Sequence, residues 1–222
     1  MGNNQHPKLE WRGDVPVALA FDDPYFSLEN GLAETRHVFL SGNGLPARFR
    51  DGFHIAELGF GTGLSCLTAL GAWLEAGCDG VLRFTSFEAF PLPVVEMERA
   101  LSGFPELAEL SKPILAAFAT GHSNVMTDHL ILEVIEGDAR QTLPKWKGAA
   151  DAWFLDGFAP ARNPELWELG LLTEVVRHTL PGGTAATYSA AGAVRRALAD
   201  AGFTVDRAPG FGRKRHMTVA RL

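Results

Sequence analysis

The chain has 222 residues, of which 46% are hydrophobic and 21% charged, a size and composition typical of one globular α/β domain. We expect no membrane span, because no apolar run approaches the ~20 residues that cross a bilayer. The net charge of −6 argues against a large nucleic-acid footprint, although seven Lys and Arg fall within the last 28 positions. Two cysteines and the lack of a secretory pattern at the start favour a cytoplasmic location.

Residues 1–50 predict a small β-rich N-terminal extension of low helical content. Two apolar stretches, VPVALAFDDPYFS and HVFLSGNGLPARF, are interrupted by turn-forming Asp-Pro and Gly-Asn-Gly. The pattern changes after this point, so we expect residues 51–222 to form the main, Rossmann-like part of a single structural domain.

Strands and helices alternate through the main part. Five buried strands are predicted in FHIAEL, VLRFTSFEAF, DHLILEVIEGDA, DAWFLDGF and GTAATYS, and four helices over residues 64–77, 92–101, 164–180 and 190–203. We expect Pro181 and two glycines to close the third helix, and a basic loop to join two strands in residues 204–222. This order predicts a mostly parallel seven-stranded sheet, covered by helices on both faces, with an antiparallel C-terminal hairpin. Ligands then bind at the carboxyl ends of the strands.

A glycine loop follows the first of these strands and indicates a cofactor site. It has the spacing GxGxG, whereas the dinucleotide fingerprint is GxGxxG, and Glu57 precedes it. This acid would repel a pyrophosphate but suit a cation. S-adenosylmethionine carries a sulfonium and an ammonium and no phosphate, so the loop favours that cofactor over NAD. The loop positions are Gly59, Phe60, Gly61, Thr62 and Gly63.

Two further acids end neighbouring strands. Glu88 can accept hydrogen bonds from both ribose hydroxyls, as acids at this point do in dinucleotide folds. A solvated acid at a strand terminus explains its position equally well. Asp138 can receive the adenine amino group or simply form a Gly-Asp turn, and the turn is slightly favoured by position alone.

Asp156 raises a sharper question because it follows the buried run AWFL. A carboxylate there is costly unless it is solvated, paired or functional. Capping the next helix is the alternative, but Asn163 before Pro164 already suits that role. We therefore expect Asp156 to be functional, with Phe158 as part of an apolar wall for a flat substrate. The aromatic stretch FDDPYFS either packs as a hydrophobic lead-in or closes over the cofactor, and its two acids, Asp22 and Asp23, favour the second.

The sequence lacks the motifs of a metal site, of a serine nucleophile and of a phosphate-binding loop. The seven histidines show no metal-ligand spacing, so no metal is expected. The sequence contains neither a GxSxG nucleophile elbow nor a GxxxxGK phosphate loop. Cys66, one helical turn after the glycines, is interpreted as a core residue.

Five segments together resemble the methyltransferase domain of the MnmC family. They are FDDPYFSLENGLAETRHVFL, AELGFGTG, FTSFEAFPL, DAWFLDGFAPARNPELW and GFGRKRHMT, and the match runs from about Leu9 to the end. LDGFAPARNPELW is far more specific than the glycine loop. MnmC proteins are bifunctional enzymes that complete 5-methylaminomethyl-2-thiouridine in tRNA.

The resemblance implies a class I methyltransferase that moves a methyl group from S-adenosylmethionine to the primary amine of 5-aminomethyl-2-thiouridine at the tRNA wobble position. Its partner would be the anticodon stem-loop, and Asp156 would accept the amine proton. Glu57, Gly59, Phe60, Gly61, Thr62, Gly63, Glu88, Asp138 and Asp156 would line the cofactor site. Tyr25, Phe158, Arg213, Lys214 and Arg215 would bind the substrate.

The bifunctional proteins continue into a FAD-dependent oxidase domain, whereas this sequence stops at Leu222. We therefore expect no FAD in this chain and a separate or fused oxidase as a partner. Two alternatives stay open. A small-molecule amine methyltransferase would suit the acidic net charge, and a failure to bind tRNA would favour it. A nicotinamide-dependent oxidoreductase or nucleotide-binding regulator would bind NAD and ignore S-adenosylmethionine.

Overall fold

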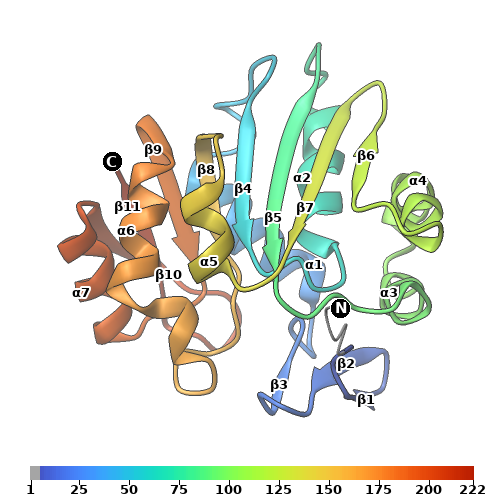
Figure 1. Cartoon of the computed structure of the whole chain (residues 1–222), viewed down its shortest axis with the longest axis horizontal. Helices are drawn as coiled ribbons and strands as arrows, with labels where there is room; N and C mark the ends of the chain where they lie inside the picture. The colour runs from blue at the N-terminus through green and yellow to red at the C-terminus, as the bar shows by residue number, and fades with distance from the viewer. Residues whose placement is uncertain (1–5) are drawn as a thin grey trace.

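The computed structural model describes residues 6–222, so the part of the expected extension in residues 1–5 lies outside the described residues (Figure 1). An eight-stranded sheet of order β10-β11-β9-β8-β4-β5-β7-β6 forms its centre. The five strands from β9 to β7 run parallel, while β6, β10 and β11 pair antiparallel with their neighbours. The strands are β4 (His54–Leu58), β5 (Leu82–Glu88), β6 (Asn124–Met126), β7 (Leu130–Glu136), β8 (Ala150–Leu155), β9 (Thr179–Thr187), β10 (Thr204–Pro209) and β11 (His216–Arg221).

The predicted mostly parallel α/β fold and its C-terminal hairpin are confirmed, but the number of seven strands is wrong. The additional strand, β6, has three residues and pairs Val125 with Leu132 of β7. A segment this short shows no alternating pattern in the sequence, so its pairing depends on the tertiary structure.

Helices cover both faces of the sheet (Figure 1). One face carries α1, α2 and α4, and the other carries α5, α6 and α7. Within residues 6–222, no helix combines the length and the apolar character needed to cross a membrane. The helices are α1 (Gly31–Thr35), α2 (Leu64–Glu75), α3 (Val94–Leu101), α4 (Ala108–Ala119), α5 (Ala139–Thr142), α6 (Leu169–Arg177) and α7 (Gly192–Ala201).

The helix predicted over residues 164–180 is shorter than expected. Residues 164–167 form a single 3₁₀ turn, and Glu168 then takes an extended conformation before α6 begins. The indole of Trp167 donates to the carbonyl of Phe158 at 3.0 Å, which holds the turn against the loop after β8. Pro181 and its two glycines lie inside β9 rather than closing the helix, beside a register irregularity in the pairing with β8.

The core divides at the sheet, because successive strand residues point to opposite faces. Phe154 packs with Phe84 on the α2 side, and Trp153 packs with Phe87 on the α6 side. All four side chains are essentially inaccessible to solvent. From Ala152 to Leu155, strand β8 is therefore apolar on both faces, and Asp156 is the first residue beyond that run.

The N-terminal extension begins as a small antiparallel sheet of β1 (Leu9–Arg12), β2 (Val15–Ala18) and β3 (Asp23–Pro24). This sheet lies below the carboxyl ends of the parallel strands (Figure 1). The expectation of low helical content is wrong over residues 31–43, which form α1 followed by π and 3₁₀ turns. Asn30 caps α1 by accepting from the N–H of Ala33, and Phe39 stacks on Phe154 of the main sheet at 5.2 Å. Packing on the sheet explains a helical segment that local pattern does not show.

Candidate functional site

A pocket of about 360 Å³ lies where the parallel strands end and the small sheet faces them. Its lining contains six carboxylate and two cationic side chains, an excess of negative charge that suits a cationic ligand. Most of the expected site residues line it: Tyr25, Gly59, Phe60, Gly61, Thr62, Glu88, Asp138, Asp156, Phe158 and Lys214. Four do not: Glu57, Gly63, Arg213 and Arg215.

The glycine loop has a backbone that requires glycine. Gly59, Gly61 and Gly63 have φ values of +93°, +52° and +81°, a region that other residues rarely adopt. A Cβ atom on Gly59 would lie 2.7 Å from the carbonyl oxygen of Asp156. The loop after β4 therefore runs directly against the end of β8, and this close approach shapes the floor of the pocket.

Glu88 joins this loop to the segment after β5. Its carboxylate accepts from the N–H of Gly61 at 2.9 Å and from the N–H of Phe90 at 2.8 Å. Burial raises the pKa of Glu88, and these backbone donors partly offset the rise. A carboxylate oxygen can accept more than one hydrogen bond, so the Glu88 carboxylate can also accept from hydroxyl groups such as those of a ribose.

Asp138 caps α5. Its carboxylate accepts from the N–H of Arg140 at 2.9 Å and forms an ion pair with the Arg140 guanidinium at 2.7 Å. The hydrogen bond from the Arg140 side chain lowers the pKa of Asp138. The Asp138 carboxylate thus already has partners, although the residue lines the pocket beside Glu88.

Asp156 lies in the pocket at the carboxyl end of β8. The hydroxyl of Ser65, in the first turn of α2, donates to its Oδ2 atom at 2.9 Å. The pKa of Asp156 is raised to about 7, chiefly by burial; the Ser65 hydrogen bond and Lys214 lower the pKa, and Glu34 adds to the rise. This carboxyl group can therefore accept or release a proton near neutral pH.

An aromatic wall forms the side of the pocket that faces the small sheet. Phe158 stacks on Phe21 with ring centroids 4.6 Å apart and meets the edge of Tyr25 at 5.2 Å. Phe90 lies 6.1 Å from Phe21 and is 44% exposed. The expectation that the FDDPYFS stretch closes over the cofactor did not single out Phe21, and Phe90, two positions after Glu88, was missed.

Acidic residues of the small sheet fix its position over the pocket. Asp23 accepts from the N–H of Ala159 at 2.7 Å, and Asp22 pairs with Arg162 at 2.9 Å. Both contacts connect the small sheet, at Asp23 of β3 and at the residue before it, to the loop that follows Asp156. The acids in the FDDPYFS stretch thus hold the wall of the pocket in place.

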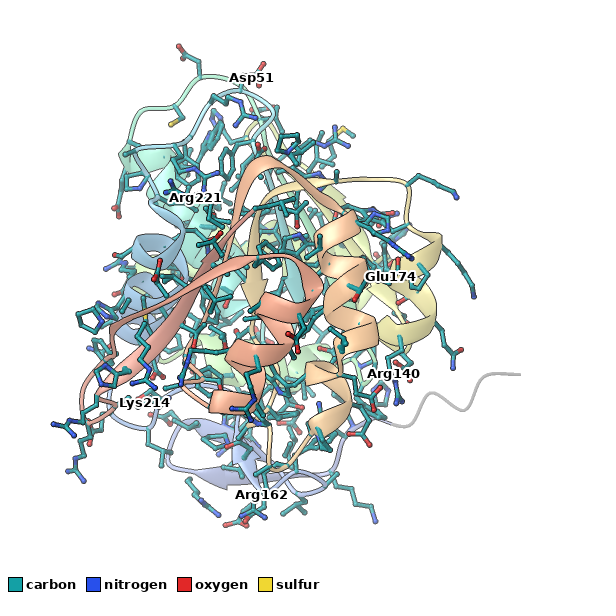
Figure 2. All side chains as sticks on the ribbon, turned by 90° about the vertical axis from the view of Figure 1, so that its left-hand side faces the viewer. Asp51, Arg140, Arg162, Glu174, Lys214 and Arg221 are labelled. Atoms are coloured by element: carbon teal, nitrogen blue, oxygen red, sulfur yellow. The ribbon has the colours of Figure 1, made fainter. Side chains whose placement is uncertain are left out.

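The three consecutive basic residues expected to act together have different surroundings. Lys214 pairs with Glu34 at 2.7 Å and lies 4.3 Å over the Tyr188 ring, so it faces the pocket. Arg213 is exposed and pairs with Glu29 at 3.2 Å, while Arg215 is also exposed. Figure 2 shows Lys214 at the end of the molecule that carries the small sheet and Arg162, opposite the end that carries Asp51.

Glu57 lies beneath the glycine loop rather than in the pocket. It is fully buried, and the hydroxyl of Ser86 donates to its Oε2 atom at 2.7 Å. Its other oxygen, Oε1, has no hydrogen-bond partner. Glu57 therefore does not contact a pocket ligand directly in this arrangement.

No cluster of three or more potential metal ligands occurs within residues 6–222.

The residues present fit S-adenosylmethionine. Gly59 and Gly61 line the pocket without side chains, the Glu88 carboxylate lies beside them, and the acidic lining favours a positively charged ligand. The site differs in these respects from a pyrophosphate site, where donors and positive charge predominate.

Comparison with known proteins supports the same conclusion. A family model described as S-adenosyl-L-methionine-dependent methyltransferase matches residues 105–222. The chain is 42% identical to the tRNA 5-methylaminomethyl-2-thiouridine biosynthesis bifunctional protein MnmC of Marinobacter nauticus, over 97% of this chain and 36% of the relative. The MnmC protein of Ectopseudomonas mendocina is 44% identical over 98% of this chain and 35% of its own length. The chain thus spans about a third of the length of these curated relatives.

Among solved structures, MNMC2 from Aquifex aeolicus superposes with a TM-score of 0.75 at 27% identity, covering 99% of this chain and 72% of that protein. The resemblance to the MnmC methyltransferase domain is confirmed by these matches. The chain belongs to the S-adenosyl-L-methionine-dependent methyltransferase family, with S-adenosyl-L-methionine as its cofactor.

Proposed function

We propose that this chain methylates the primary amine of 5-aminomethyl-2-thiouridine at the tRNA wobble position, giving 5-methylaminomethyl-2-thiouridine. The names of the relatives point to this nucleoside. The observation that carries the proposal is Asp156, a carboxylate with a pKa of about 7 in an acidic pocket beside the glycine loop. An oxidase in the remaining part of the relatives, or in a separate chain, would provide the aminomethyl substrate.

The cofactor would lie along the glycine loop, with its ribose hydroxyls on Glu88 and its adenine near Asp138. When bound, S-adenosylmethionine supplies a methyl group on a positively charged sulfur. Asp138 already holds Arg140, so its main contribution is to fix the start of α5 beside the adenine. The acidic lining balances the positive charge of the ligand.

Asp156 would prepare the amine for reaction. An aliphatic amine has a pKa near ~10, so presenting its free lone pair at neutral pH costs roughly 4 kcal/mol. Asp156 can accept the ammonium proton at its carboxylate and hold the nitrogen in a fixed orientation. Tyr25 and Phe158 would position the flat base, because their rings form the wall next to Asp156.

We expect Glu88→Ala to weaken S-adenosylmethionine binding by about one to two decades, because it removes a hydrogen-bonded charged acceptor. The variant also releases the N–H groups of Gly61 and Phe90, so the loop loses a restraint. Isothermal calorimetry measures the affinity directly. Glu133→Ala, an exposed acid at the middle of β7, is the control. Unchanged affinity in Glu88→Ala would remove Glu88 from the cofactor site.

The exposed arginines of the β10–β11 loop are expected to contact tRNA phosphates. Lys214 faces the pocket, so we leave it unchanged and reverse only Arg213 and Arg215 to Glu. This double variant should bind tRNA more weakly and reduce the slope of log affinity against log salt by about two. Reversal of Lys145 and Lys147, exposed residues just before β8 at the opposite end of the sheet, is the matched control.

Filter binding over a range of salt concentrations measures both effects, and calorimetry should show unchanged cofactor affinity. Equal losses of tRNA affinity in the loop variant and the control variant would mean that binding depends only on the net charge of the protein. A loop variant with wild-type tRNA affinity and salt slope would show that Arg213 and Arg215 belong to a solvated loop.

The proposed function is tested by mass spectrometry of tRNA nucleosides from cells that lack this protein. Accumulation of 5-aminomethyl-2-thiouridine, reversed by restoring the gene, is the expected result. A small-molecule amine methyltransferase, which the net charge of −6 favours, predicts unchanged tRNA nucleosides instead.

A further inference from the structure

Lys214 is a pocket cation that the proposed mechanism does not use. Two cationic side chains line the pocket, and the other one, Arg140, is held by Asp138 in an ion pair at 2.7 Å. The Lys214 ammonium donates to Glu34 Oε1 at 2.7 Å, and its side chain is about half exposed. A cation in a mainly acidic pocket calls for an explanation, because it disfavours a ligand that is positive throughout.

A continuous set of contacts connects Lys214 to the residue after Asp156. The Nζ atom of Lys214 lies 4.3 Å from the centre of the Tyr188 ring. The hydroxyl of Tyr188 in turn donates to the carbonyl of Gly157 at 2.8 Å. Gly157 directly follows Asp156, and all four residues line the same pocket. Lys214 therefore lies at the side of the pocket where Asp156 would hold the amine.

Attachment of the β10–β11 loop to the N-terminal extension does not require Lys214. Arg213 pairs with Glu29 at 3.2 Å, and the His37 ring donates to the carbonyl of Pro209 at 2.9 Å. Both contacts already join the hairpin to the extension. The Arg213 side chain is 93% exposed, whereas Lys214 lines the pocket. A role toward the pocket ligand therefore explains the position of Lys214 better than a role in attachment alone.

The ammonium of Lys214 keeps donor capacity for a ligand. It has three N–H groups, and Glu34 accepts from one of them. The contact with the Tyr188 ring is electrostatic and leaves the remaining donors able to reach an oxygen atom. Like charges repel, so the ammonium of an acceptor belongs at Asp156 and an acceptor oxygen belongs at Lys214. In a 5-aminomethyl uracil ring, the C4 carbonyl is the neighbour of the carbon that carries the aminomethyl group.

We propose that Lys214 is a specificity-determining residue that donates a hydrogen bond to the C4 carbonyl oxygen of the acceptor base. Glu34 and Tyr188 hold its ammonium in place for this contact. The inference rests on the proposed function, because it takes 5-aminomethyl-2-thiouridine as the acceptor. Lys214 then distinguishes the base from a plain aliphatic amine, which has no such oxygen. It reads the base, whereas Arg213 and Arg215 would contact phosphates.

A comparison of two acceptors tests the contact. One anticodon stem-loop RNA carries 5-aminomethyl-2-thiouridine at the wobble position, and the other carries its 4-deoxy analogue, which lacks the C4 oxygen. With saturating S-adenosylmethionine, the wild type should show a kcat/KM about ten- to a hundredfold higher for the first acceptor, because the second leaves a charged donor without its partner. Lys214→Met keeps the apolar stem over Tyr188 but has no donor, so it should lose this preference.

The ratio between the two acceptors removes indirect effects of the substitution. Lys214 also lowers the pKa of Asp156, but a change there slows both acceptors equally. Lys112→Met is the matched control, since Lys112 pairs with Glu109 on α4 at 2.5 Å and does not line the pocket. Its preference should equal that of the wild type. Calorimetry with S-adenosylmethionine should show wild-type affinity in both variants, which establishes that they fold.

The salt dependence of tRNA binding gives a second readout. Lys214→Met should keep the wild-type slope of log affinity against log salt, because a base carbonyl binds no counterion that Lys214 would release. A slope reduced by about one would assign Lys214 to a phosphate and overturn the inference.

The outcomes separate the inference from the function on which it rests. A wild type that methylates both stem-loops equally well, or a Lys214→Met variant that keeps the wild-type preference, overturns the Lys214 assignment and leaves the proposed function standing. A wild type that methylates neither stem-loop removes the proposed function, and the Lys214 assignment with it.

Discussion

Asp156→Asn is expected to reduce kcat for methyl transfer by roughly 10²- to 10⁴-fold, the usual contribution of a general base. Asparagine keeps the shape of the side chain and can still accept from Ser65, but it has neither the charge nor the basicity needed to take the ammonium proton. Steady-state kinetics with tRNA carrying the aminomethyl nucleoside measures the loss. Cofactor affinity, measured by calorimetry, should change far less because Glu88 and the loop remain.

The stability of this variant separates a catalytic role from a structural one. The folded pKa of Asp156 is about 7 against an ordinary value of 3.8, so between these values the folded state binds more protons than the unfolded state. Stability from this group is complete below pH 3.8 and is lost as pH rises through 7. Removing the charge should therefore raise the free energy of unfolding at pH 8, by at most roughly 4 kcal/mol, and the melting temperature should rise with it. A parallel loss of activity and thermal stability would contradict the catalytic assignment.

The pH dependence of the wild-type enzyme is expected to show a large acid limb. Protonated Asp156 cannot accept the amine proton, so log kcat/KM should rise by about one per pH unit up to a midpoint near 7 and then level off. The rate at pH 5 should thus be about one hundredth of the plateau. Rate measurements at constant ionic strength, with cofactor saturating at each pH, give this profile.

The Asp156→Asn variant supplies the control for the profile. Its low residual rate should keep rising above pH 7, because hydroxide and buffer bases then deprotonate the amine without help from the enzyme. A wild-type rate that is flat between pH 5 and 7, or a variant that keeps the same midpoint, would assign the acid limb to another group.

The parts of the fold that follow from local pattern were predictable. The strand before the glycine loop, the loop and α2 follow from an apolar run, three glycines and apolar residues at helical spacing. The conformations of residues 31–43 and of β6 could not be predicted in this way. They depend on packing against other segments, such as Phe39 on Phe154 and Val125 beside Leu132.

The same distinction applies to the site. Glu88 and Asp156 were expected near each other because parallel strands end at one edge of the sheet, and both line the pocket. The separate environments of Lys214 and Arg213 depend on Glu34 and Glu29, partners about 180 positions away in the chain. The burial of Glu57 beneath the loop likewise depends on how β4 and β5 pair, which places Ser86 beside it.

A reaction with purified components tests the proposed methyl transfer most directly. The protein is incubated with S-adenosylmethionine carrying a labelled methyl group and with tRNA that contains 5-aminomethyl-2-thiouridine, and the digested nucleosides are separated and identified by mass spectrometry. We expect labelled 5-methylaminomethyl-2-thiouridine at the wobble position with the wild type, and roughly 10²- to 10⁴-fold slower labelling with Asp156→Asn. Label on another nucleoside, or transfer only to free small amines while the tRNA stays unlabelled, would contradict it.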